Sequence, residues 1–526
     1  MNMNAAGPSQ GAKRDDAGRD RLFGPSDPAQ AGSEPRASAP LGGSAAHEVA
    51  SVGATAMMTL QQAALWIAGA QLVGDGQTSV QRVHTDTRTL EPGDLFVALK
   101  GERFDGNDFL VEAKAKGAVA AICQGDGQAA LARAGLPGLV VSDSKQALGQ
   151  LATGWRQQFR LPLIAVTGSN GKTTVTQMIA SILQAFKPQA MLATQGNLNN
   201  DIGVPLTLLR LRAQHEVAVV ELGMNHPGEI ALLSSMARPT VALVNNAQRE
   251  HLEFMATIEA VARENGAVIE TLDSSGVAVF PADDAYSTLW LGLTAKRPHL
   301  TFAITPQRDA ADVTCASPAW TKGAWDVQVH TPAGDLRYSL QVAGLHNVKN
   351  SLAAAACALA VGVPLADIAR GLQAFEPVKG RSRALAVELS GHPLTLVDDT
   401  YNANPDSVRA AIDVLAGLPG PRLLVLGDMG EVGNEGPRFH TEVGGYARER
   451  GIEMLYGIGE MTAMAVSQFG AGQHFTDIDA LNMATLEALP RMASVLVKGS
   501  RFMKMERVVQ AITARAQQNK EEKHAA

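Results

Sequence analysis

The stretch Leu-Ile-Ala-Val-Thr-Gly-Ser-Asn-Gly-Lys-Thr-Thr, at residues 163–174, limits the possible folds of this 526-residue chain more than any other. Its four apolar residues at 163–166 predict a short buried strand. The residues that follow predict a helix, because one apolar stripe recurs at helical spacing: Val175, Met178, Ile179, Ile182 and Leu183. A strand that passes through a glycine turn into a helix is typical of an α/β fold.

The glycine turn has the composition of a phosphate-binding loop. Free backbone N–H groups and the positive end of the helix dipole both point at an anion bound there. Lys172 would reach the β- and γ-phosphates of a nucleotide, and the Thr173 hydroxyl would contact Mg²⁺. The loop is shorter than the usual G-x-x-x-x-G-K-[ST], since Val166 stands where that pattern has glycine. A glycine-rich turn with a solvated lysine is the alternative.

The composition is that of a large globular protein. A chain of 526 residues is too long for one core, so roughly two to four domains are expected. The net charge of −7 and the pI near 6.0 argue against nucleic acid as the main partner. No apolar run approaches the roughly 18 residues of a membrane span. Cys123, Cys315 and Cys357 lack metal-ligand spacing and are expected to be reduced thiols of a cytoplasmic protein.

The N-terminal 56 residues differ in composition from the rest of the chain. They are rich in Gly, Ala, Ser and Pro and contain no Trp, Tyr or Ile. Such a segment buries too little apolar surface to offset the entropy of ordering, so residues 1–56 are predicted to be disordered. Sequence typical of folded structure begins at Met57 and Met58. A physiological start near these methionines is a hypothesis that an intact-mass measurement of the native protein would test.

The remaining residues predict three α/β domains. Residues 57–156 would form a small N-terminal domain, and residues 157–376 a central domain with a parallel sheet around the phosphate loop. Residues 377–518 alternate short apolar strands with helical patterns, which predicts a second, Rossmann-like parallel sheet. The polar residues 519–526 are expected to fray.

Short apolar runs predict strands in each domain. In the first domain they are 83–88 (a strand end), 95–99, 119–122 and 139–141; in the second, 163–166, 217–221 and 241–244; in the third, 394–397, 422–426, 454–456 and 495–497. Further helices are predicted at 60–67 and at the alanine-rich residues 351–361.

Polar residues follow several of these strands, at the edge of a parallel sheet where ligands bind. Glu221 ends one strand and could complete a Mg²⁺ shell beside the phosphate loop, although a solvated acid or helix cap is the alternative. His251 follows the next strand and is a candidate metal ligand, with a packing or surface histidine as the alternative. Thr85, Asp86 and Arg88 form a comparable edge in the first domain, where turn capping is equally compatible.

Asp-Asp-Thr-Tyr-Asn-Ala-Asn-Pro, at residues 398–405, is the most unusual stretch. It places two acids, a tyrosine and two asparagines in a rigid turn after a predicted strand. Asparagine side chains both donate and accept hydrogen bonds, which suits a ligand with an amine and an amide. The glycine-containing residues 425–433 and 497–501 also follow strands and would line the same edge.

Together these motifs resemble the ATP-dependent Mur ligases of peptidoglycan synthesis, over residues 58–510. Residues 167–173 resemble the family's shortened phosphate loop, Gly-Leu-His-Asn-Val-Lys-Asn at 344–350 its adenine-side motif, and Lys-Gly-Arg at 379–381 a motif whose arginine meets the ATP phosphates. The stretches at 196–205, 398–405 and 427–431 resemble the branch that adds D-alanyl-D-alanine to UDP-N-acetylmuramoyl-tripeptide.

The resemblance implies roles for individual residues. Lys172, His251 and Arg381 would be catalytic, and Thr173, Glu221 and His251 would bind Mg²⁺. The implied ATP-binding residues are Gly168, Ser169, Asn170, Gly171, Lys172, Thr173, Thr174, His346, Asn347, Asn350, Arg381 and Asp399. The implied substrate-binding residues are Thr85, Asp86 and Arg88 at the UDP end, and Asn199, Asn200, Asn402 and Asn404 elsewhere.

The sequence departs from the family pattern at three places. Asp-Thr-Arg at 86–88 replaces Asp-Ser-Arg, and Asp-Gly-Asn at 105–107 replaces Asp-Gly-His. Many Mur ligases also carry a carbamylated lysine that balances the charge of the metals, and Asn265 falls at that position here. Either Glu264 or water substitutes for it, or the second metal is held differently.

The resemblance implies that ATP phosphorylates the C-terminal carboxylate of the UDP-linked tripeptide. The amine of D-alanyl-D-alanine would then attack the acyl phosphate, in a cytoplasmic enzyme expected to be a monomer. A tripeptide-forming Mur ligase or a folylpolyglutamate synthetase is one alternative, sharing the ATP motifs but lacking residues 398–405. A nucleotide-binding switch is another; it would need neither that turn nor the first domain.

Overall fold

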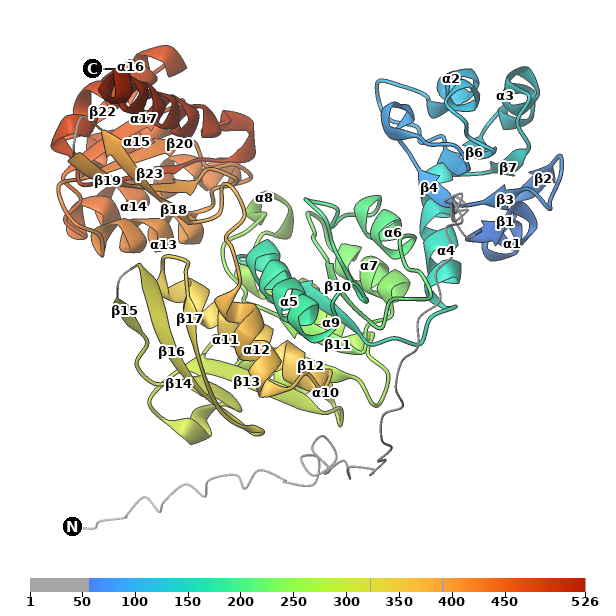
Figure 1. Cartoon of the computed structure of the whole chain (residues 1–526), viewed down its shortest axis with the longest axis horizontal. Helices are drawn as coiled ribbons and strands as arrows, with labels where there is room; N and C mark the ends of the chain where they lie inside the picture. Colours follow the sequence, from blue (N-terminus) through green and yellow to red (C-terminus); the bar gives the residue numbers. More distant parts are fainter. Residues whose placement is uncertain (1–55, 322, 390–391, 526) are drawn as a thin grey trace, which may run out of the picture. The chain divides into compact units, whose positions relative to one another are not determined.

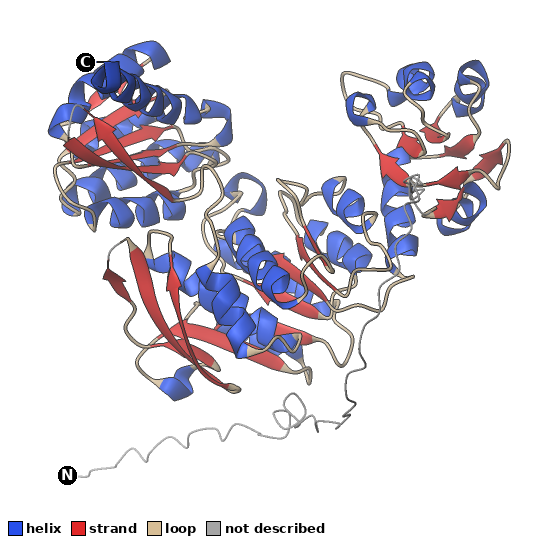
Figure 2. Cartoon of the chain, viewed as in Figure 1, coloured by secondary structure: helices blue, strands red, loops and turns tan. Residues whose placement is uncertain are grey.

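The computed structural model of the chain describes residues 56–321, 323–389 and 392–525 (Figure 1). The disorder predicted for residues 1–56 therefore concerns, apart from Ala56, residues that lie outside the described part. Three larger sheets carry helices on their faces (Figure 2), which confirms the α/β class.

The N-terminal sheet has the strand order β2-β7-β6-β5-β4, in which β2 is antiparallel to β7 and the others are parallel. Its strands are β2 (Gln71–Val73), β4 (Arg82–His84), β5 (Asp94–Val97), β6 (Ala120–Gln124) and β7 (Gly138–Val141), with β1 (Met58–Thr59) and β3 (Ser79–Val80) paired separately. Its helices are α1 (Leu60–Trp66), α2 (Leu110–Ala115), α3 (Gly127–Ala134) and α4 (Ser144–Arg156).

The central sheet has ten strands, in the order β15-β16-β14-β13-β12-β11-β8-β10-β9 with β17 beside β16. The strands are β8 (Leu163–Thr167), β9 (Met191–Ala193), β10 (Val217–Glu221), β11 (Val241–Val244), β12 (Val277–Pro281), β13 (His299–Ile304), β14 (Val313–Cys315), β15 (Ala319–Thr321), β16 (Ala324–Thr331) and β17 (Gly334–Leu340). β8 to β14 are parallel, and β15, β16 and β17 are antiparallel additions.

Eight helices of the central part follow these strands: α5 (Lys172–Phe186), α6 (Gly203–Leu208), α7 (Glu229–Ala237), α8 (Leu252–Met255), α9 (Ile258–Glu270), α10 (Ser287–Thr294), α11 (Leu345–Ala360) and α12 (Leu365–Gln373). α11 and α12 both pack beside α5 (Figure 1). β8 lies between β10 and β11, so the chain leaves β8 towards one side of the sheet and later returns to the other. Ligands of open α/β sheets bind at such a switch point, outside the carboxyl ends of the strands.

The C-terminal sheet has the order β18-β19-β23-β20-β21-β22, parallel except for β18. Its strands are β18 (Arg383–Leu389), β19 (His392–Asp399), β20 (Arg422–Gly427), β21 (Met454–Ile458), β22 (Gln473–Phe475) and β23 (Ser494–Lys498). Its helices are α13 (Pro405–Ala416), α14 (Gly436–Glu449), α15 (Thr462–Phe469), α16 (Ile478–Ala488) and α17 (Glu506–Ala525).

The alternating direction of apolar side chains along the C-terminal strands explains why helices cover both faces of this sheet. Leu424 and Leu426 of β20 pack in a core with α13, α14 and α15, whereas Leu423 and Val425 pack in another with α16 and α17. Successive side chains of a strand point to opposite faces, so continuous apolar runs need helices on both. The predicted Rossmann-like layering follows from this pattern.

The structure corrects two predicted boundaries, at α11 and at the C-terminal tail. α11 begins at Leu345 and not at Ser351, so the motif at 344–350 lies in the first turns of the helix. The strand end predicted at 83–88 is present: β4 ends at His84, and the Asp86 side chain then accepts a hydrogen bond from Arg88 N and starts a 3₁₀ turn. The tail predicted to fray at 519–526 continues α17 as far as Ala525.

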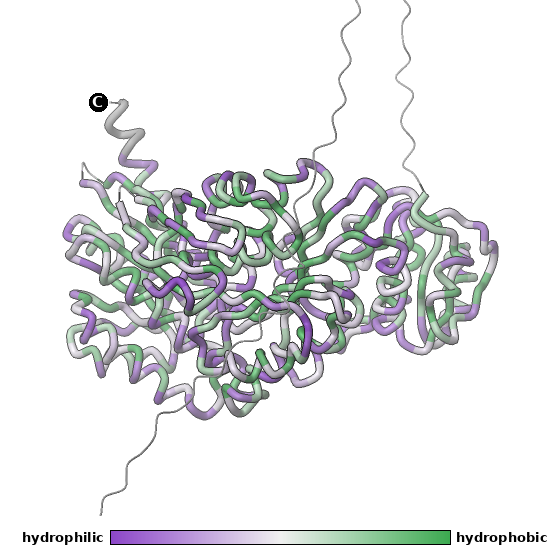
Figure 3. Tube along the Cα trace, turned by 90° about the horizontal axis from the view of Figure 1, so that it is seen from below, coloured by the Kyte–Doolittle hydropathy of each residue, from purple (hydrophilic) through white to green (hydrophobic). Residues whose placement is uncertain are grey.

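Hydrophobic and hydrophilic segments alternate along the trace (Figure 3). In the described part of the chain, no helix combines the length and the apolar composition needed to cross a membrane.

Candidate active site

A cavity of about 580 Å³ opens at the carboxyl ends of β8 and β10. It is lined by most of the predicted site residues: Ser169, Asn170, Gly171, Lys172, Thr173, Thr174, Asn199, Asn200, Glu221, His251, His346, Asn347, Asn350, Arg381, Asp399, Asn402 and Asn404. These residues come from distant parts of the sequence, and their convergence on one cavity makes it the candidate active site.

The phosphate loop between β8 and α5 depends on two glycines. Gly168 and Gly171 have φ angles of 128° and 82°, which L side chains rarely adopt. A Cβ on Gly171 would lie 2.7 Å from Asn350 Oδ1. The backbone N–H of Gly168 donates to Asn265 Oδ1 at 2.8 Å, and that of Asn170 donates to Asn246 Oδ1 at 2.8 Å. The loop is therefore braced by side-chain amides on its protein side.

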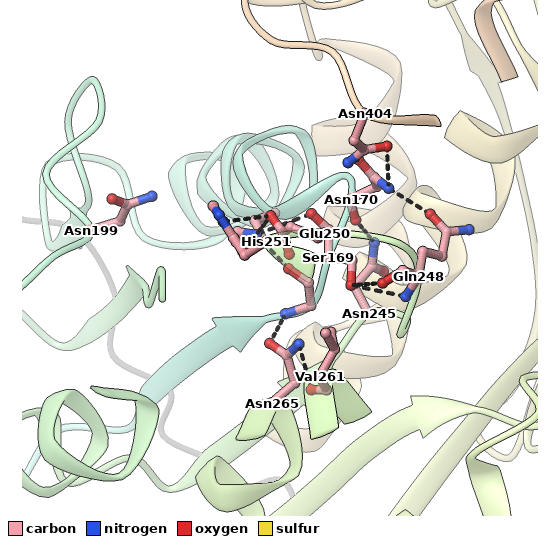
Figure 4. A network of polar contacts seen from close by, with 12 residues as sticks. Ser169, Asn170, Asn199, Asn245, Gln248, Glu250, His251, Val261, Asn265 and Asn404 are labelled. Atoms are coloured by element: carbon pink, nitrogen blue, oxygen red, sulfur yellow. Dashed lines mark hydrogen bonds and ion pairs between the residues drawn. The ribbon is translucent and has the colours of Figure 1, made fainter. Parts of the chain in front are cut away.

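Asparagines of α11 take part in this bracing (Figure 4 shows the neighbouring contacts of Asn170 and Asn245). Asn245 Nδ2 donates to the Asn170 carbonyl at 2.8 Å and to Asn350 Oδ1 at 3.0 Å. Asn350 Nδ2 in turn donates to Asn347 Oδ1 at 3.0 Å. Asn347 and Asn350 are thus buried supports of the loop, while His346 in the same turn is half-buried at the cavity.

Lys172 points back over the loop. Its Nζ donates to the carbonyls of Gly168 and Ser169, at 2.5 and 3.1 Å, and to Glu250 Oε1 at 2.8 Å. Carbonyls and a carboxylate hold the ammonium where a phosphate would replace the carboxylate as its partner.

Glu221 lies beside Thr173, as predicted for a pair that shares a metal. Thr173 Oγ1 donates to Glu221 Oε1 at 3.1 Å, and Asn199 Nδ2 donates to the same oxygen at 2.8 Å. The other oxygen, Oε2, is buried and has no hydrogen-bond partner among the described residues. A buried carboxylate oxygen without a partner is costly unless a cation satisfies it.

His251 lies between two carboxylates. Its Nδ1 is 2.7 Å from Glu431 Oε2, and its Nε2 is 3.4 Å from Glu250 Oε1. Burial alone would lower the pKa of His251, but the carboxylates of Glu250 and Glu431 outweigh it and raise the pKa to about 9. Among the described residues, no group of three or more His, Cys, Asp or Glu side chains is arranged so that it could hold a metal ion. His251 is thus placed at the cavity, as an ion-pair partner.

The structure also places Asn265, at the position of the carbamylated lysine, and Glu264, its suggested substitute. Asn265 is fully buried; its Oδ1 accepts from Gly168 N, and its Nδ2 donates to the Val261 carbonyl at 3.1 Å. The carboxylate of Glu264 accepts from the backbone N–H groups of Gly228 and Ile230, both at 2.8 Å, at the start of α7. Neither side chain lines the cavity, whereas the carboxylate of Glu250 does.

The C-terminal sheet supplies Asp399, Arg381 and the two predicted asparagines. Burial would raise the pKa of Asp399, but Lys498, with its Nζ 2.6 Å from Oδ2, keeps it below its usual value. The Arg381 guanidinium stacks 3.9 Å above the centre of the Tyr401 ring. Asn402 Oδ1 accepts from Ala403 N at 2.9 Å.

Asn404 both caps a helix and lines the cavity. It is the N-cap of α13, where its Oδ1 accepts from Ser407 N at 2.8 Å. Its Nδ2 donates to Asn170 Oδ1 at 3.0 Å, so the residue links the C-terminal turn to the phosphate loop (Figure 4).

Thr85, Asp86 and Arg88 do not line this cavity. Arg88 is largely exposed, and its Nη2 lies 2.6 Å from Asp86 Oδ2. Hydrogen bonds from Arg88 lower the pKa of Asp86 to about 2. The predicted polar edge of the first domain is thus a separate surface.

Several charged residues of the site and one beside it were not predicted from the sequence. Lys498, Glu250 and Glu431 line the cavity, and Arg249 adjoins it with ion pairs to Asp406 and Glu442 at 2.6 and 2.8 Å. Lys498 and Glu431 stand in glycine-containing stretches that follow strands, a signal too common to single them out. Glu250 and Arg249 stand directly before His251, where no local pattern marks them.

Fold and site together define an ATP-dependent ligase that has its phosphate loop at the switch point of a parallel sheet. Three sequence models of the same family match the chain: Mur ligase family, catalytic domain, over residues 79–156; Mur ligase middle domain over 166–358; and Mur ligase, glutamate ligase domain, over 382–501. The chain belongs to the Mur ligase family.

Curated and solved relatives agree with this assignment. The UDP-N-acetylmuramoyl-tripeptide–D-alanyl-D-alanine ligase of Escherichia coli (strain K12) is 41% identical over 436 residues, which cover 82% of this chain and 94% of that protein. A crystal structure of MurF from Acinetobacter baumannii matches with a TM-score of 0.78 and 35% identity, covering 87% of this chain and 98% of that one. MurF ligase from Thermotoga maritima, in complex with ADP, matches with a TM-score of 0.71 and 26% identity, covering 83% and 98%.

Proposed function

We propose that this chain joins D-alanyl-D-alanine to UDP-N-acetylmuramoyl-tripeptide at the expense of ATP, forming the pentapeptide precursor of peptidoglycan. The relatives at 41% and 35% identity support this activity. The observation that carries the proposal for these residues is a single cavity lined both by the phosphate loop and by Asn402 and Asn404 of the turn at 398–405.

ATP would lie along the phosphate loop with its phosphates at the N-terminus of α5. Lys172 and Arg381 would neutralise the phosphate oxygens, and His346 and Asp399 would lie on the nucleoside side. Lys172 and Arg381 would stabilise the developing negative charge most strongly in a cavity that excludes water, because a lower dielectric constant strengthens the electrostatic interaction.

Thr173 and Glu221 fit a Mg²⁺ ion, since Glu221 Oε2 is buried without a partner beside the Thr173 hydroxyl. His251 pairs with Glu250 and Glu431 in this structure, and its role as a further Mg²⁺ ligand stays a prediction. When bound, Mg²⁺ supplies positive charge that neutralises the phosphate oxygens.

The chemistry follows from the poor electrophilicity of a free carboxylate. The tripeptide carboxylate attacks the γ-phosphorus of ATP, which yields an acyl phosphate and ADP. The amine of D-alanyl-D-alanine, after losing a proton, attacks the acyl carbon, and the tetrahedral intermediate expels phosphate to leave the amide. Lys172 and Arg381 hold the phosphoryl group, and the protein's main contribution is the positioning of anionic reactants.

The UDP end of one substrate would bind to the first domain, and the peptide ends would bind in the cavity. Thr85, Asp86 and Arg88 would contact the UDP end, which gives residues 57–156 a UDP-binding role. Asn199 and Asn200 would contact the tripeptide, and Asn402 and Asn404 would contact the dipeptide.

The three cysteines are buried thiols, which supports a cytoplasmic location.

Phosphate release from ATP tests the activity. Purified protein with UDP-linked tripeptide should release phosphate only when D-alanyl-D-alanine is added, with a product heavier by the dipeptide less water. Release triggered by single D-alanine or glutamate would point to another amide-forming ligase of the same fold. ATP binding without release under any of these conditions would favour a nucleotide switch.

Lys172→Ala tests the phosphate loop. The variant should lose ligation by a factor of about a thousand while its far-ultraviolet circular dichroism is unchanged. Lys187→Ala is the control, because Lys187 follows the same helix and pairs with Glu216 at the surface. Turnover retained in Lys172→Ala would remove the loop from the mechanism.

A further inference from the structure

Most carboxylates that line the cavity already have a partner. Glu250 is bonded to Lys172, and Asp399 to Lys498. Asp406 is bound by Arg249, and Asp201 lies 2.7 Å from Lys145 Nζ. Glu229 accepts hydrogen bonds from two backbone N–H groups at the start of its own helix, those of Asn225 and His226. Glu221 faces Thr173 and the phosphate loop.

Glu431 differs from these carboxylates in its greater exposure, and its partner is a histidine. Its ion pair is with His251, and 47% of its side chain is exposed, whereas those of Glu250 and Asp399 are 12% and 14% exposed. It lines the main cavity and also a cleft of about 10 Å³ that it shares with Asn402, Ala403 and Asn404. Glu431 is therefore the accessible carboxylate on the side of the cavity that the turn at 398–405 forms.

The backbone holds Glu431 in this place at a conformational cost. Its φ of 58° is left-handed, a conformation that costs a non-glycine residue about 1 kcal/mol. The residues before it are fixed: Met429 N donates to His440 Nε2 at 3.0 Å, and Ser500 Oγ donates to the Asp428 carbonyl at 2.5 Å. Strain of this kind persists where the surroundings determine the conformation, and it is concentrated at functional sites.

A carboxylate on this side would bind one end of the incoming substrate. An α-amino group has a pKa near 8, so the incoming dipeptide arrives mainly as an ammonium ion at neutral pH. A charge-assisted hydrogen bond to a carboxylate is the strongest single contact that such a group can make. Lys172, Arg381 and Lys498, which would attract phosphates and carboxylates, would repel it.

We propose that Glu431 binds the ammonium group of the incoming dipeptide and so places its nitrogen at the acyl phosphate, which this nitrogen attacks after the ammonium has lost a proton to water. This inference rests on the proposed function and adds a substrate-binding residue to it. His251 holds the carboxylate in the direction of the cavity, and Asn402 lies beside it for the polar groups of the dipeptide.

Glu431→Gln removes the charge and keeps the shape, and two acceptors separate its effects. KM for D-alanyl-D-alanine should rise about tenfold or more, equivalent to about 1.4 kcal/mol. Hydroxylamine, an uncharged nucleophile at mildly alkaline pH, should still capture the acyl phosphate as the hydroxamate at an unchanged rate. Glu431→Gly should behave likewise without any penalty from the left-handed backbone, which removes misfolding as an explanation.

Glu435→Gln is the matched control, because Glu435 lies four residues further on and pairs with Arg438 at the surface. It should change neither reaction. An unchanged KM for the dipeptide in Glu431→Gln would overturn the inference, and so would an equal loss of hydroxamate and amide formation. Failure of the unmodified protein to form either product would instead overturn the proposed function.

Discussion

Gly171 shows how much of the phosphate loop depends on one missing side chain. Its φ of 82° positions the N–H groups at the start of α5, and the space on its protein side is filled by Asn245 and Asn350. Those two amides are hydrogen-bonded to one another, so they cannot move aside cheaply.

Gly171→Ala should therefore cost more than a left-handed backbone alone. Gly196→Ala is the control, because Gly196 has a φ of 59° and open space where a Cβ would be. Both variants should lose about 1 kcal/mol from the backbone, and Gly171→Ala should lose ATP binding as well. Calorimetric titration with ATP would measure the difference, and equal affinities in the two variants would contradict this account of the loop.

His251 gives the site a pH-dependent contribution to stability. The pKa of His251 is raised from a usual value of 6.5 to about 9 by Glu250 and Glu431, so folding favours the protonated ring. The stabilisation is fully present below about pH 6.5 and is lost as the pH rises through about 9. Urea midpoints measured across this window should fall more in the unmodified protein than in His251→Gln. Parallel curves would show that the two carboxylates do not stabilise the imidazolium.

At the scale of single elements, α13 connects a local sequence signal to the site. Asn404, Pro405 and Ser407 form a capping box with proline at the first helical position, a pattern that starts a helix on its own. The same Asn404 also reaches Asn170 in the phosphate loop. The Asn404 side chain therefore belongs both to the start of α13 and to the candidate active site.

Asn404→Ala should destabilise the protein by about 1 kcal/mol, the usual cost of losing an N-cap, and should also lower ligation. Asp477→Ala is the matched control, because Asp477 caps α16 by accepting from Ala480 N at 2.8 Å and does not line the cavity. It should cost similar stability and leave KM for ATP and the dipeptide unchanged. An equal loss of activity in both variants would show that the hydrogen bond between Asn404 and Asn170 does not contribute to ligation.

At the scale of the whole molecule, Arg249 ties the loop after β11 to the C-terminal helices. Its guanidinium binds Asp406 of α13 and Glu442 of α14, and it lies over the ring of Phe439. The preceding residue, Gln248, accepts from Asn170 Nδ2 at 2.6 Å and donates from its backbone N–H to Ser169 Oγ at 2.9 Å. Gln248 and Arg249 therefore connect the C-terminal helices to the phosphate loop by hydrogen bonds and ion pairs.

Arg249→Met should cost about 2–3 kcal/mol, because it leaves Asp406 without its ion-pair partner and leaves Glu442 with Arg409 as its remaining one. It should also raise KM for ATP without contacting the nucleotide. Arg422→Met is the control, since the Arg422–Glu453 pair at 3.0 Å lies within the C-terminal sheet region. A change in KM for ATP in the control as large as in Arg249→Met would remove the special role of Arg249.

Features that depend on neighbours along the chain could be predicted from the amino-acid sequence. The phosphate loop and the strands at 217–221 and 241–244 are local patterns of periodicity and glycine, and the structure has them where those patterns place them. Only the tertiary structure decided which charges meet. The Glu431–His251, Lys498–Asp399 and Arg249–Asp406 pairs join residues 99 to 180 positions apart, counting 431 minus 251, 498 minus 399 and 406 minus 249. Ion pairing carries no periodic signal, because it depends on packing that brings the carboxyl ends of two sheets to one cavity.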